Sequence, residues 1–313
     1  MSDIGIIIVT YNSAAEIGPC LDAALGRGAD IVVVDNASQD GTIAEVARRG
    51  VRLIANETNR GFAAAVNQGF VVLNSPYVLL LNPDAVLQSD LTAMCRACDL
   101  PDSAGAGGRL VNADGTPQLG FMARRLPTAT ALALEALLLN RVWPDNPVNR
   151  RYRALDLDPG RSCTVEQPAG AFLMIRRQVW QELGGFDEAF WPLWFEDVDF
   201  CRRVKDRGYR MHYVAEAVAK HTGGHSIPQL SVEKRRVYWY RSLLRYSARH
   251  FRSWPFRAVS LAVVAGSLLR AILESAAHLS LRPMASSGSV VRLAFRCLVF
   301  GRRGGAVQFV PGM

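Results

Sequence analysis

A carboxylate placed directly after an apolar run is the first feature of this sequence that could do chemistry. Residues 77–81 read as a short buried strand, and Asn82-Pro83-Asp84 ends it because proline cannot donate to a β-ladder. In open α/β sheets, ligands bind beyond the carboxyl ends of the strands. Asp84 is therefore a candidate ligand for a divalent cation on a diphosphate, whose oxygens would complete the coordination. An ordinary Asn-Pro-Asp turn would explain the same residues.

A second group of acids follows an aromatic stretch later in the chain. Glu196, Asp197 and Asp199 come directly after residues 190–195, four of which are aromatic. Apolar surroundings raise the pKa of a carboxyl group by desolvation, and such a group is a better general base. The stretch therefore contains a candidate catalytic carboxylate. The alternative is an acidic helix N-terminus that the helix dipole favours for structural reasons alone.

Polar residues also follow the first two predicted strands, residues 4–9 and 31–35. Asp35 could accept a hydrogen bond from a pyrimidine N–H, and Tyr11 could stack on or flank the base. Three further side chains could bond ribose or phosphate: Asn12, Arg60 and Asn67. The alternative is that these loops only cap the helices that follow. The sequence has no Gly-x-Gly-x-x-Gly after the first strand and no P-loop, so a metal and side chains must neutralise any bound phosphates.

Two later segments add candidates to the same site. Gly170 and Ala171 precede an apolar strand and would let a sugar approach the backbone closely. His221 and His225 lie in a glycine-containing loop after the last predicted strand, over residues 209–214. A neutral imidazole at His221 could be a second metal ligand beside Asp84. A solvated loop histidine is the plainer alternative.

Strands alternate with helices through the first two thirds of the chain, which predicts an α/β fold with a mainly parallel, doubly wound sheet. We expect this catalytic domain over residues 1–230 and a helical tail over 231–313. Arg124-Arg125 and residues 143–153 indicate an excursion off the sheet of the kind that often shapes a pocket. The six scattered cysteines include one isolated Cys-x-x-Cys pair and indicate reduced thiols in a cytosolic protein without a signal peptide.

The tail is strongly basic. Residues 231–313 contain 14 Lys or Arg and 2 Asp or Glu, a net +12, whereas residues 1–230 contain 22 and 26, a net −4. The longest run without charge, 258–269, has only twelve residues, which disfavours a membrane-spanning helix. A helix lying in the lipid headgroup plane is expected from the following residues: Arg241, Arg245, Arg249, Arg252 and Arg257, beside Trp239, Tyr240, Trp254 and Phe256. A helix packed on the catalytic domain is the alternative, and nucleic-acid binding fits the apolar content poorly.

Six motifs within residues 4–226 occur in the order typical of family-2 inverting glycosyltransferases with the GT-A fold, which this chain resembles. They are Thr10-Tyr11-Asn12, Val34-Asp35-Asn36-Ala37-Ser38 with Asp40-Gly41-Thr42, Asn59-Arg60-Gly61-Phe62, Asn82-Pro83-Asp84, Gly184-Gly185-Phe186-Asp187-Glu188 and Phe195-Glu196-Asp197-Val198-Asp199. Within the family, the chain looks most like bacterial rhamnosyltransferases. The family's metal motif is often Asp-x-Asp, and its first position is Asn82 here, which makes His221 more important as a ligand.

The resemblance implies roles for individual residues. Asp84 and His221 would hold Mg or Mn on the donor diphosphate, and Asp197, with Glu196 beside it, would deprotonate the acceptor hydroxyl. The nucleotide sugar would be bound by Thr10, Tyr11, Asn12, Asp35, Asn36, Arg60, Asn67, Asn82, Asp84 and Gly170.

The resemblance further implies transfer of L-rhamnose from dTDP-rhamnose to a polyprenyl-diphosphate-linked N-acetylglucosamine, for cell-wall or surface polysaccharide synthesis. The enzyme would sit peripherally on the cytoplasmic face of the plasma membrane, at an anionic membrane surface. Two alternatives remain. One is the same fold with a UDP- or GDP-sugar donor, for galactofuranosyl, glucosyl or mannosyl transfer. The other is a catalytically silent membrane scaffold.

Overall fold

The computed structural model describes residues 3–223, 231–278 and 282–301, so His225 lies outside the described residues. The chain forms two compact units. Unit 1 contains Met1–Leu126, Arg153–Glu188 and Glu196–Gln229, and unit 2 contains Pro127–Tyr152, Ala189–Phe195 and Leu230–Met313. The sequence predicts a single boundary between residues 230 and 231. The structure differs, because the segments 127–152 and 189–195 belong with the C-terminal helices.

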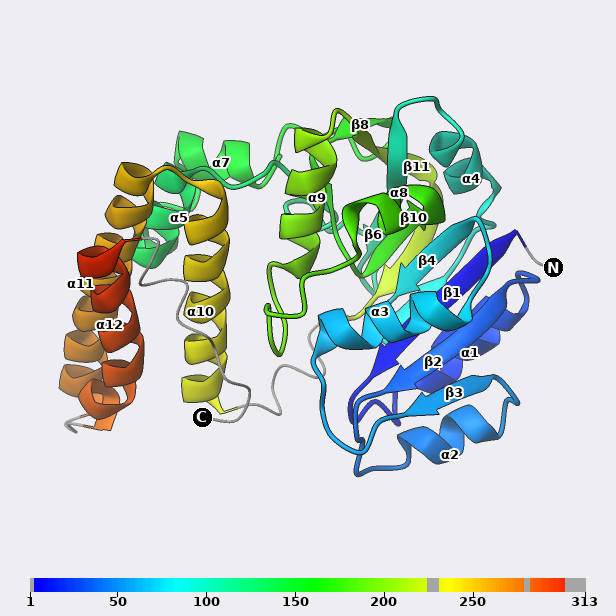
Figure 1. Cartoon of the computed structure of the whole chain (residues 1–313), viewed down its shortest axis with the longest axis horizontal. Coiled ribbons are helices and arrows are strands. Elements are labelled where there is room, and N and C mark those ends of the chain that lie inside the picture. The colour runs from blue at the N-terminus through cyan, green and yellow to red at the C-terminus, as the bar shows by residue number, and fades with distance from the viewer. Residues whose placement is uncertain (1–2, 224–230, 279–281, 302–313) are drawn as a thin grey trace. The chain divides into compact units, whose positions relative to one another are not determined.

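Unit 1 is built on one nine-stranded sheet (Figure 1). Its strands are β1 (Ile4–Thr10), β2 (Asp30–Asp35), β3 (Arg52–Ala55), β4 (Tyr77–Leu81), β5 (Ala85–Leu87), β6 (Ser103–Val111), β8 (Cys163–Val165), β10 (Phe172–Arg176) and β11 (Arg210–His221). The order is β3-β2-β1-β4-β10-β6-β11-β5, and β8 pairs with β11. β7 (Ala123–Arg124) and β9 (Gln167–Pro168) form a separate two-stranded sheet.

The main sheet is mixed but mostly parallel, as predicted. β3, β2, β1 and β4 run parallel to one another. β10 lies antiparallel between β4 and β6, and β11 runs parallel to β6. β5 and β8 are antiparallel to β11. The carboxyl ends of β1, β2 and β4 therefore meet at one edge, where α/β sheets bind ligands.

Helices cover both faces of this sheet (Figure 1). The helices of unit 1 are α1 (Ile17–Leu25), α2 (Thr42–Ala47), α3 (Phe62–Val72), α4 (Thr92–Cys98), α8 (Arg177–Leu183) and α9 (Glu196–Asp206). Along β1, Ile6 and Ile8 belong to the core under α1 and α4, whereas Ile7 faces Gly69 of α3. Because both faces are buried, the strand is continuously apolar and not alternating.

Strand β11 is longer than the sequence predicts. The structure continues it to His221, across a register shift between Val214 and Val218. His221 is therefore the last residue of a strand and not a loop residue, and it pairs with Ala85, the neighbour of Asp84. The pairing of β11 with β5 brings the two predicted metal ligands together.

A glycine turn after α8 ties α3, α8 and α9 together. The Asn67 side chain clamps it, because Asn67 Oδ1 accepts from Phe186 N at 3.1 Å and Nδ2 donates to Phe186 O at 3.0 Å. From α9, Arg203 donates to Gly185 O at 2.8 Å and forms a 2.8 Å ion pair with the fully buried Asp199. This network fixes the start of α9, where the candidate catalytic acids lie.

Unit 2 is helical. It contains α5 (Ala129–Ala136), α6 (Leu139–Val142), α7 (Pro147–Tyr152), α10 (Val232–His250), α11 (Ser253–His278) and α12 (Arg282–Phe300). α11 packs on α5 so closely that a Cβ on Gly266 would meet the Ala136 carbonyl. By length and composition alone, Ser253–Ala277 could cross a bilayer, although 44% of its most apolar window is buried inside the protein. The sequence disfavours a membrane-spanning helix because the uncharged run 258–269 is short, but the length and hydropathy of the whole helix do not exclude one.

The structure differs from the predicted helix in the lipid headgroup plane, because several of its residues are buried. Tyr240, Arg241 and Phe256 are buried, at 5%, 9% and 0% exposure, because they face the interior of the helical unit. The exposed large apolar residues of this region lie on α11 and α12 instead: Trp254, Leu261, Leu268, Leu269, Ile272, Leu273, Phe295, Val299 and Phe300.

The glycine turn gives a test of the fold. Gly184 and Gly185 both have φ of 72°, which disfavours any side chain, but only Gly185 is also crowded, with its added Cβ 2.8 Å from Asn67 Oδ1. We expect Gly184→Ala to lower the free energy of unfolding by about 1 kcal/mol and Gly185→Ala by about 2–3 kcal/mol. Urea denaturation of both variants measures this, and equal losses would show that the clamp at Asn67 does not constrain the turn.

Candidate active site

The predicted metal ligands face each other at the end of the sheet in unit 1. Asp84 and His221 are 8% and 3% exposed, and Asp84 Oδ1 lies 3.5 Å from His221 Nε2. Burial would raise the pKa of the Asp84 carboxyl, but the His221 ring and backbone N–H groups outweigh it and hold that pKa below its usual value. Asp84 is therefore a buried carboxylate in its charged form.

The tautomer of His221 follows from Gln118. Gln118 Nε2 donates to His221 O at 2.8 Å and to Asn112 Oδ1 at 2.9 Å, so its Oε1 must accept from His221 Nδ1–H at 3.0 Å. In the neutral ring, Nε2 then carries a lone pair directed toward Asp84. Phe121 stacks on the imidazole, with ring centroids 5.2 Å apart, and holds its orientation.

These residues fit a divalent cation. His221 Nε2 is buried and has no hydrogen-bond partner closer than Asp84 Oδ1 at 3.5 Å; in the neutral ring its lone pair faces the carboxylate, and either a proton on Nε2 or a cation would offset their repulsion. A second hydrogen bond from the far ring nitrogen, as Gln118 provides, is the usual support of a metal-bound histidine. Among the described residues no three His, Cys, Asp or Glu side chains gather as a complete metal site. Two protein ligands suit a cation whose other ligands are phosphates and water.

The loops after β1 and β2 are locked together by Asp35. Its carboxylate is fully buried and accepts from Thr10 Oγ1 at 2.7 Å, Ser38 Oγ at 2.5 Å and Ser38 N at 2.8 Å. These bonds occupy both oxygens, so Asp35 and Thr10 shape the loop. Contact between Asp35 and a base stays a prediction, and it would require Ser38 to move.

Asn12 and Asn36 hold the neighbouring loops. Asn12 has φ of 49° and its Oδ1 accepts from Gln39 N at 2.7 Å, while the partly exposed Tyr11 precedes it. Asn36 Nδ2 donates to Gly61 O at 3.2 Å. Left-handed backbone at a non-glycine residue next to a ligand edge is the kind of strain found at binding sites.

Of the remaining predicted donor-binding residues, Arg60 and Asn82 have uncommitted side chains. Arg60 is exposed, and its guanidinium has no partner within the described part of the chain. The Asn82 amide likewise has no side-chain partner there. Asn67 differs from the prediction, because its amide is occupied by Phe186 and by Glu188 Oε1 at 2.9 Å. Its observed role is to clamp the glycine turn.

Asp197, the second residue of α9, lies in a setting suited to a base. Its Oδ2 accepts from Gln167 Nε2 at 3.2 Å and Gly170 N at 3.3 Å, and its Oδ1 accepts from Val198 N at 2.8 Å. Burial raises the pKa of the Asp197 carboxyl, although these N–H groups and the charge of Arg124 oppose the rise. A Cβ on Gly170 would meet Asp197 Oδ2 at 3.3 Å, so the glycine makes room for the acid.

Glu196 is more deeply buried than its neighbour. It is 6% exposed, and its Oε2 has no hydrogen-bond partner. Burial and the charge of Asp197 raise the pKa of the Glu196 carboxyl well above its usual value. Glu196 therefore holds a proton more readily than Asp197, and Asp197 is the better candidate for the base.

Two chains of contacts in unit 1 connect the metal ligands with Asp197. In the first, Asn82 N donates to Ala171 O at 3.0 Å, and Gly170, next to Ala171, contacts Asp197. In the second, Phe121 stacks on His221, and the Arg124 guanidinium lies 5.9 Å from the Phe121 ring centroid. Arg124 in turn acts on Asp197 through its charge. The metal ligands and the candidate base therefore belong to one connected cluster.

Sequence reasoning missed four members of this cluster: Gln118, Phe121, Arg124 and Gln167. They come from residues 101–168, which have no regular period, and from the short strands β7 and β9. The small turn at residues 112–116 is the one local sequence feature that points to these residues. It reverses the chain, so that Pro117 pairs with Val111 at the end of β6.

Comparison with known proteins shows the family of the chain. Residues 5–181 match the family model described as Glycosyl transferase family 2, and residues 153–301 match Glycosyl transferase family group 2. The chain is 28% identical over 281 residues to the N-acetylglucosaminyl-diphospho-decaprenol L-rhamnosyltransferase of Mycobacterium tuberculosis, covering 80% of this chain and 90% of that protein. It is 25% identical over 195 residues to Rhamnosyltransferase WbbL of Escherichia coli, covering 61% and 69%.

A solved structure supports the fold. A mannosyltransferase from Pyrobaculum calidifontis, in complex with GDP-Man and Mn²⁺, superposes with a TM-score of 0.52 at 18% identity, covering 97% of this chain and 86% of the other. This likeness confirms the predicted GT-A fold.

The raised pKa of Glu196 gives a test by pH. A carboxyl group with a raised pKa in the folded state adds stability below its unfolded pKa, and this is lost as pH rises through the folded pKa. Glu196→Gln should therefore gain free energy of unfolding relative to the wild type as pH rises above about 4.5, the ordinary pKa of the group. Urea denaturation from pH 4.5 to 8 measures this, with the exposed Glu57→Gln as control. A difference that stays constant with pH would contradict the assignment.

Proposed function

Because the chain belongs to glycosyl transferase family 2, we propose that it is an inverting glycosyltransferase that moves L-rhamnose from dTDP-rhamnose to polyprenyl-diphosphate-linked N-acetylglucosamine. The observation that carries the proposal is the close pair of Asp84 and His221, connected to Asp197 through the backbone contact of Asn82 with Ala171, the neighbour of Gly170. The sugar and the acceptor are supported by the 28% identity, over nearly the whole length, to an enzyme named for that transfer.

The donor diphosphate would bind at the end of β4. Asp84 and His221 would hold Mg²⁺ or Mn²⁺, and the bound cation would neutralise charge that develops on the leaving nucleoside diphosphate. The uncommitted guanidinium of Arg60 is available for a phosphate oxygen, as is the Asn82 amide for an oxygen of the donor. Tyr11, partly exposed beyond β1, would flank the base.

Asp197 would act on the acceptor. As the acceptor oxygen attacks the anomeric carbon, its proton passes to the Asp197 carboxylate, and the bond from that carbon to the diphosphate oxygen breaks. Attack opposite the leaving group inverts the configuration at the anomeric carbon. The raised pKa of Asp197 favours acceptance of the proton, and the Gln167 amide and Gly170 N–H hold the carboxylate in place.

The donor alternatives share this mechanism. A UDP- or GDP-sugar would use the same metal ligands and base, for galactofuranosyl, glucosyl or mannosyl transfer. Mass spectrometry of products formed from a panel of nucleotide sugars and a short prenyl-diphosphate-linked N-acetylglucosamine separates these donors. Product from dTDP-rhamnose supports the proposal, and product only from another donor contradicts it. A catalytically silent scaffold is disfavoured, since Asp84 and Asp197 are both in place.

A lipid-linked acceptor requires access to a membrane, and α11 offers a suitable surface. Its exposed side chains Leu261, Leu268 and Ile272 recur at helical spacing on one face, with no charge between residues 258 and 269. Together with the net charge of +12 over residues 231–313, this face would seat the protein peripherally on the anionic cytoplasmic leaflet.

Removal of the base should separate chemistry from binding. We expect Asp197→Asn to lower kcat by about 10²- to 10⁴-fold and to leave donor affinity nearly unchanged. Stopped-flow turnover and calorimetric donor binding measure the two effects, with Asp206→Asn at the far end of α9 as control. An equal loss of donor binding would mean that Asp197 holds the nucleotide and is not the base.

Removal of the imidazole should weaken the metal site. His221→Ala is expected to raise the Kd for Mn²⁺ about 10- to 100-fold, and Gln118→Leu about 10-fold, because Gln118 only fixes the tautomer. Mn²⁺ electron paramagnetic resonance measures this with nucleoside diphosphate present, and His212→Ala on the same strand is the control. An unchanged Mn²⁺ titration in His221→Ala would rule out ligation.

Introducing acidic residues on the exposed face of α11 should weaken binding of the protein to lipid. We expect the double variant Leu268→Glu/Ile272→Glu to lower partitioning onto phosphatidylglycerol vesicles at least about tenfold, since each buried leucine or isoleucine contributes about 1.5–3 kcal/mol. Vesicle flotation measures the bound fraction. Val71→Glu, at an 82% exposed position on α3, is the control, and equal binding of both variants would show that α11 does not face the membrane.

A further inference from the structure

Unit 2 contains a pocket that the proposed catalytic cluster does not use. Its cavity volume is about 340 Å³, within the range of about 300–1,000 Å³ typical of small-molecule sites. We name it the arginine pocket. It is lined by Glu135, Arg141, Trp194, Val232, Arg235, Arg236, Trp239, Tyr240 and Arg270.

The lining carries more positive than negative charge. Four arginines face a single acid, Glu135, whose carboxylate already accepts from Asn140 Nδ2 at 2.7 Å. Arg236 is neutralised outside the lining by its double hydrogen bond to Glu274. The remaining three arginines against Glu135 leave a net charge of +2, which is the charge an anionic ligand would balance.

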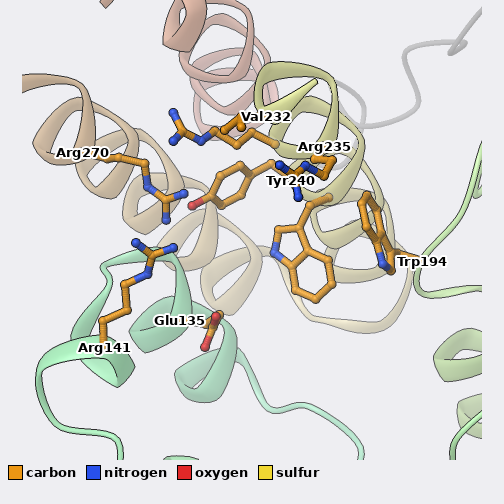
Figure 2. Close-up of a pocket in the computed structure, with 9 residues that line it drawn as sticks. Glu135, Arg141, Trp194, Val232, Arg235, Tyr240 and Arg270 are labelled. Atoms are coloured by element: carbon orange, nitrogen blue, oxygen red, sulfur yellow. The ribbon is translucent and has the colours of Figure 1, made fainter. Parts of the chain in front are cut away.

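Two of these arginines have a buried nitrogen atom that makes no hydrogen bond to the protein. Arg235 Nε and Arg270 Nε are inaccessible to solvent and make no hydrogen bond. In the described parts of unit 2, neither guanidinium has an ion-pair partner. In Figure 2 the guanidinium groups of Arg270 and Arg141 and the Tyr240 hydroxyl point toward one another. Like charges converge on one point here, which is unfavourable unless an anion lies between them.

Aromatic residues make the opposite wall. Trp194 contacts Trp239 edge-on, with ring centroids 5.7 Å apart, and Phe195 lies against Trp239 at 5.2 Å. A cavity with cationic forks on one side and indole faces on the other suits a phosphate group that carries a sugar, because sugars stack on aromatic rings and arginine binds phosphate oxygens bidentately.

We propose that the arginine pocket binds the diphosphate of the lipid-linked acceptor, separately from the metal that would hold the donor diphosphate. This inference rests on the proposed function. Trp194, which lines the pocket, lies three positions before Asp197 in the sequence.

The neighbouring helix surface suits the rest of the ligand. Arg270 lies on the packed side of α11, whereas Leu268, Leu269 and Ile272 are exposed at the same level of that helix. A diphosphate held by Arg270 would leave its prenyl chain free to lie along an apolar face. A positively charged pocket beside an apolar helix surface suits a lipid that carries phosphate better than it suits a soluble anion.

The test is direct binding, which needs no turnover. Full-length protein is floated with phosphatidylcholine vesicles that carry a polyprenyl diphosphate, and separately with vesicles that carry phosphatidylglycerol at the same charge. We expect Arg270→Gln and Arg141→Gln each to weaken binding to the diphosphate vesicles about tenfold or more, and to leave binding to phosphatidylglycerol unchanged. Inorganic pyrophosphate should compete only on the diphosphate vesicles. Arg292→Gln, exposed on α12, is the control.

Equal loss on both vesicle types would make the pocket a general anionic-lipid site and overturn the proposal, as would no loss on either. Arg141 is exposed, so Arg141→Gln tests the pocket even where Arg270→Gln fails to fold. Kinetics with the short prenyl acceptor add a second readout: KM for the acceptor should rise about tenfold while KM for the donor stays the same. Selective diphosphate binding without any transfer would refute the proposed function and leave the pocket intact.

Discussion

The site depends on one electrostatic arrangement, a buried carboxylate oxygen and a buried imidazole lone pair 3.5 Å apart at the end of one strand pair. Gln118 fixes the hydrogen on the far ring nitrogen, so Asp84 and His221 face each other as two acceptors. In the neutral ring such a pair is repulsive in a low-dielectric interior unless a proton or a cation lies between the two atoms. The antiparallel pairing of β5 with β11 brings the two side chains together.

Other contacts in unit 1 hold Asp197, the proposed base, in place. Asn67 and Arg203 fix the turn before α9 and the helix itself, and Gly170 allows the backbone of the neighbouring segment to approach Asp197. Burial then raises the proton affinity of Asp197, although it lies at a helix N-terminus where a carboxylate is normally favoured in its charged form.

Much of this could be predicted from the sequence, and the failures have physical causes. Strand ends marked by turn residues, such as Asp84 after β4, are local signals that the sequence locates correctly. The sequence predicts a loop at His221, because the register shift after Val214 breaks the alternating pattern of β11. Asn67 looks like a ligand contact in the sequence, but its partner Phe186 is 119 residues away, which no local pattern reveals. The arginine pocket could not be predicted for the same reason, because its residues come from three segments that are far apart in the sequence.

The most direct test is anomalous diffraction at the manganese edge from crystals grown with a nucleoside diphosphate and Mn²⁺. The account predicts one strong peak bonded to Asp84 and His221 Nε2, with the diphosphate oxygens completing its coordination. A well-occupied diphosphate with manganese bound elsewhere, or with none bound at these two side chains, would contradict it.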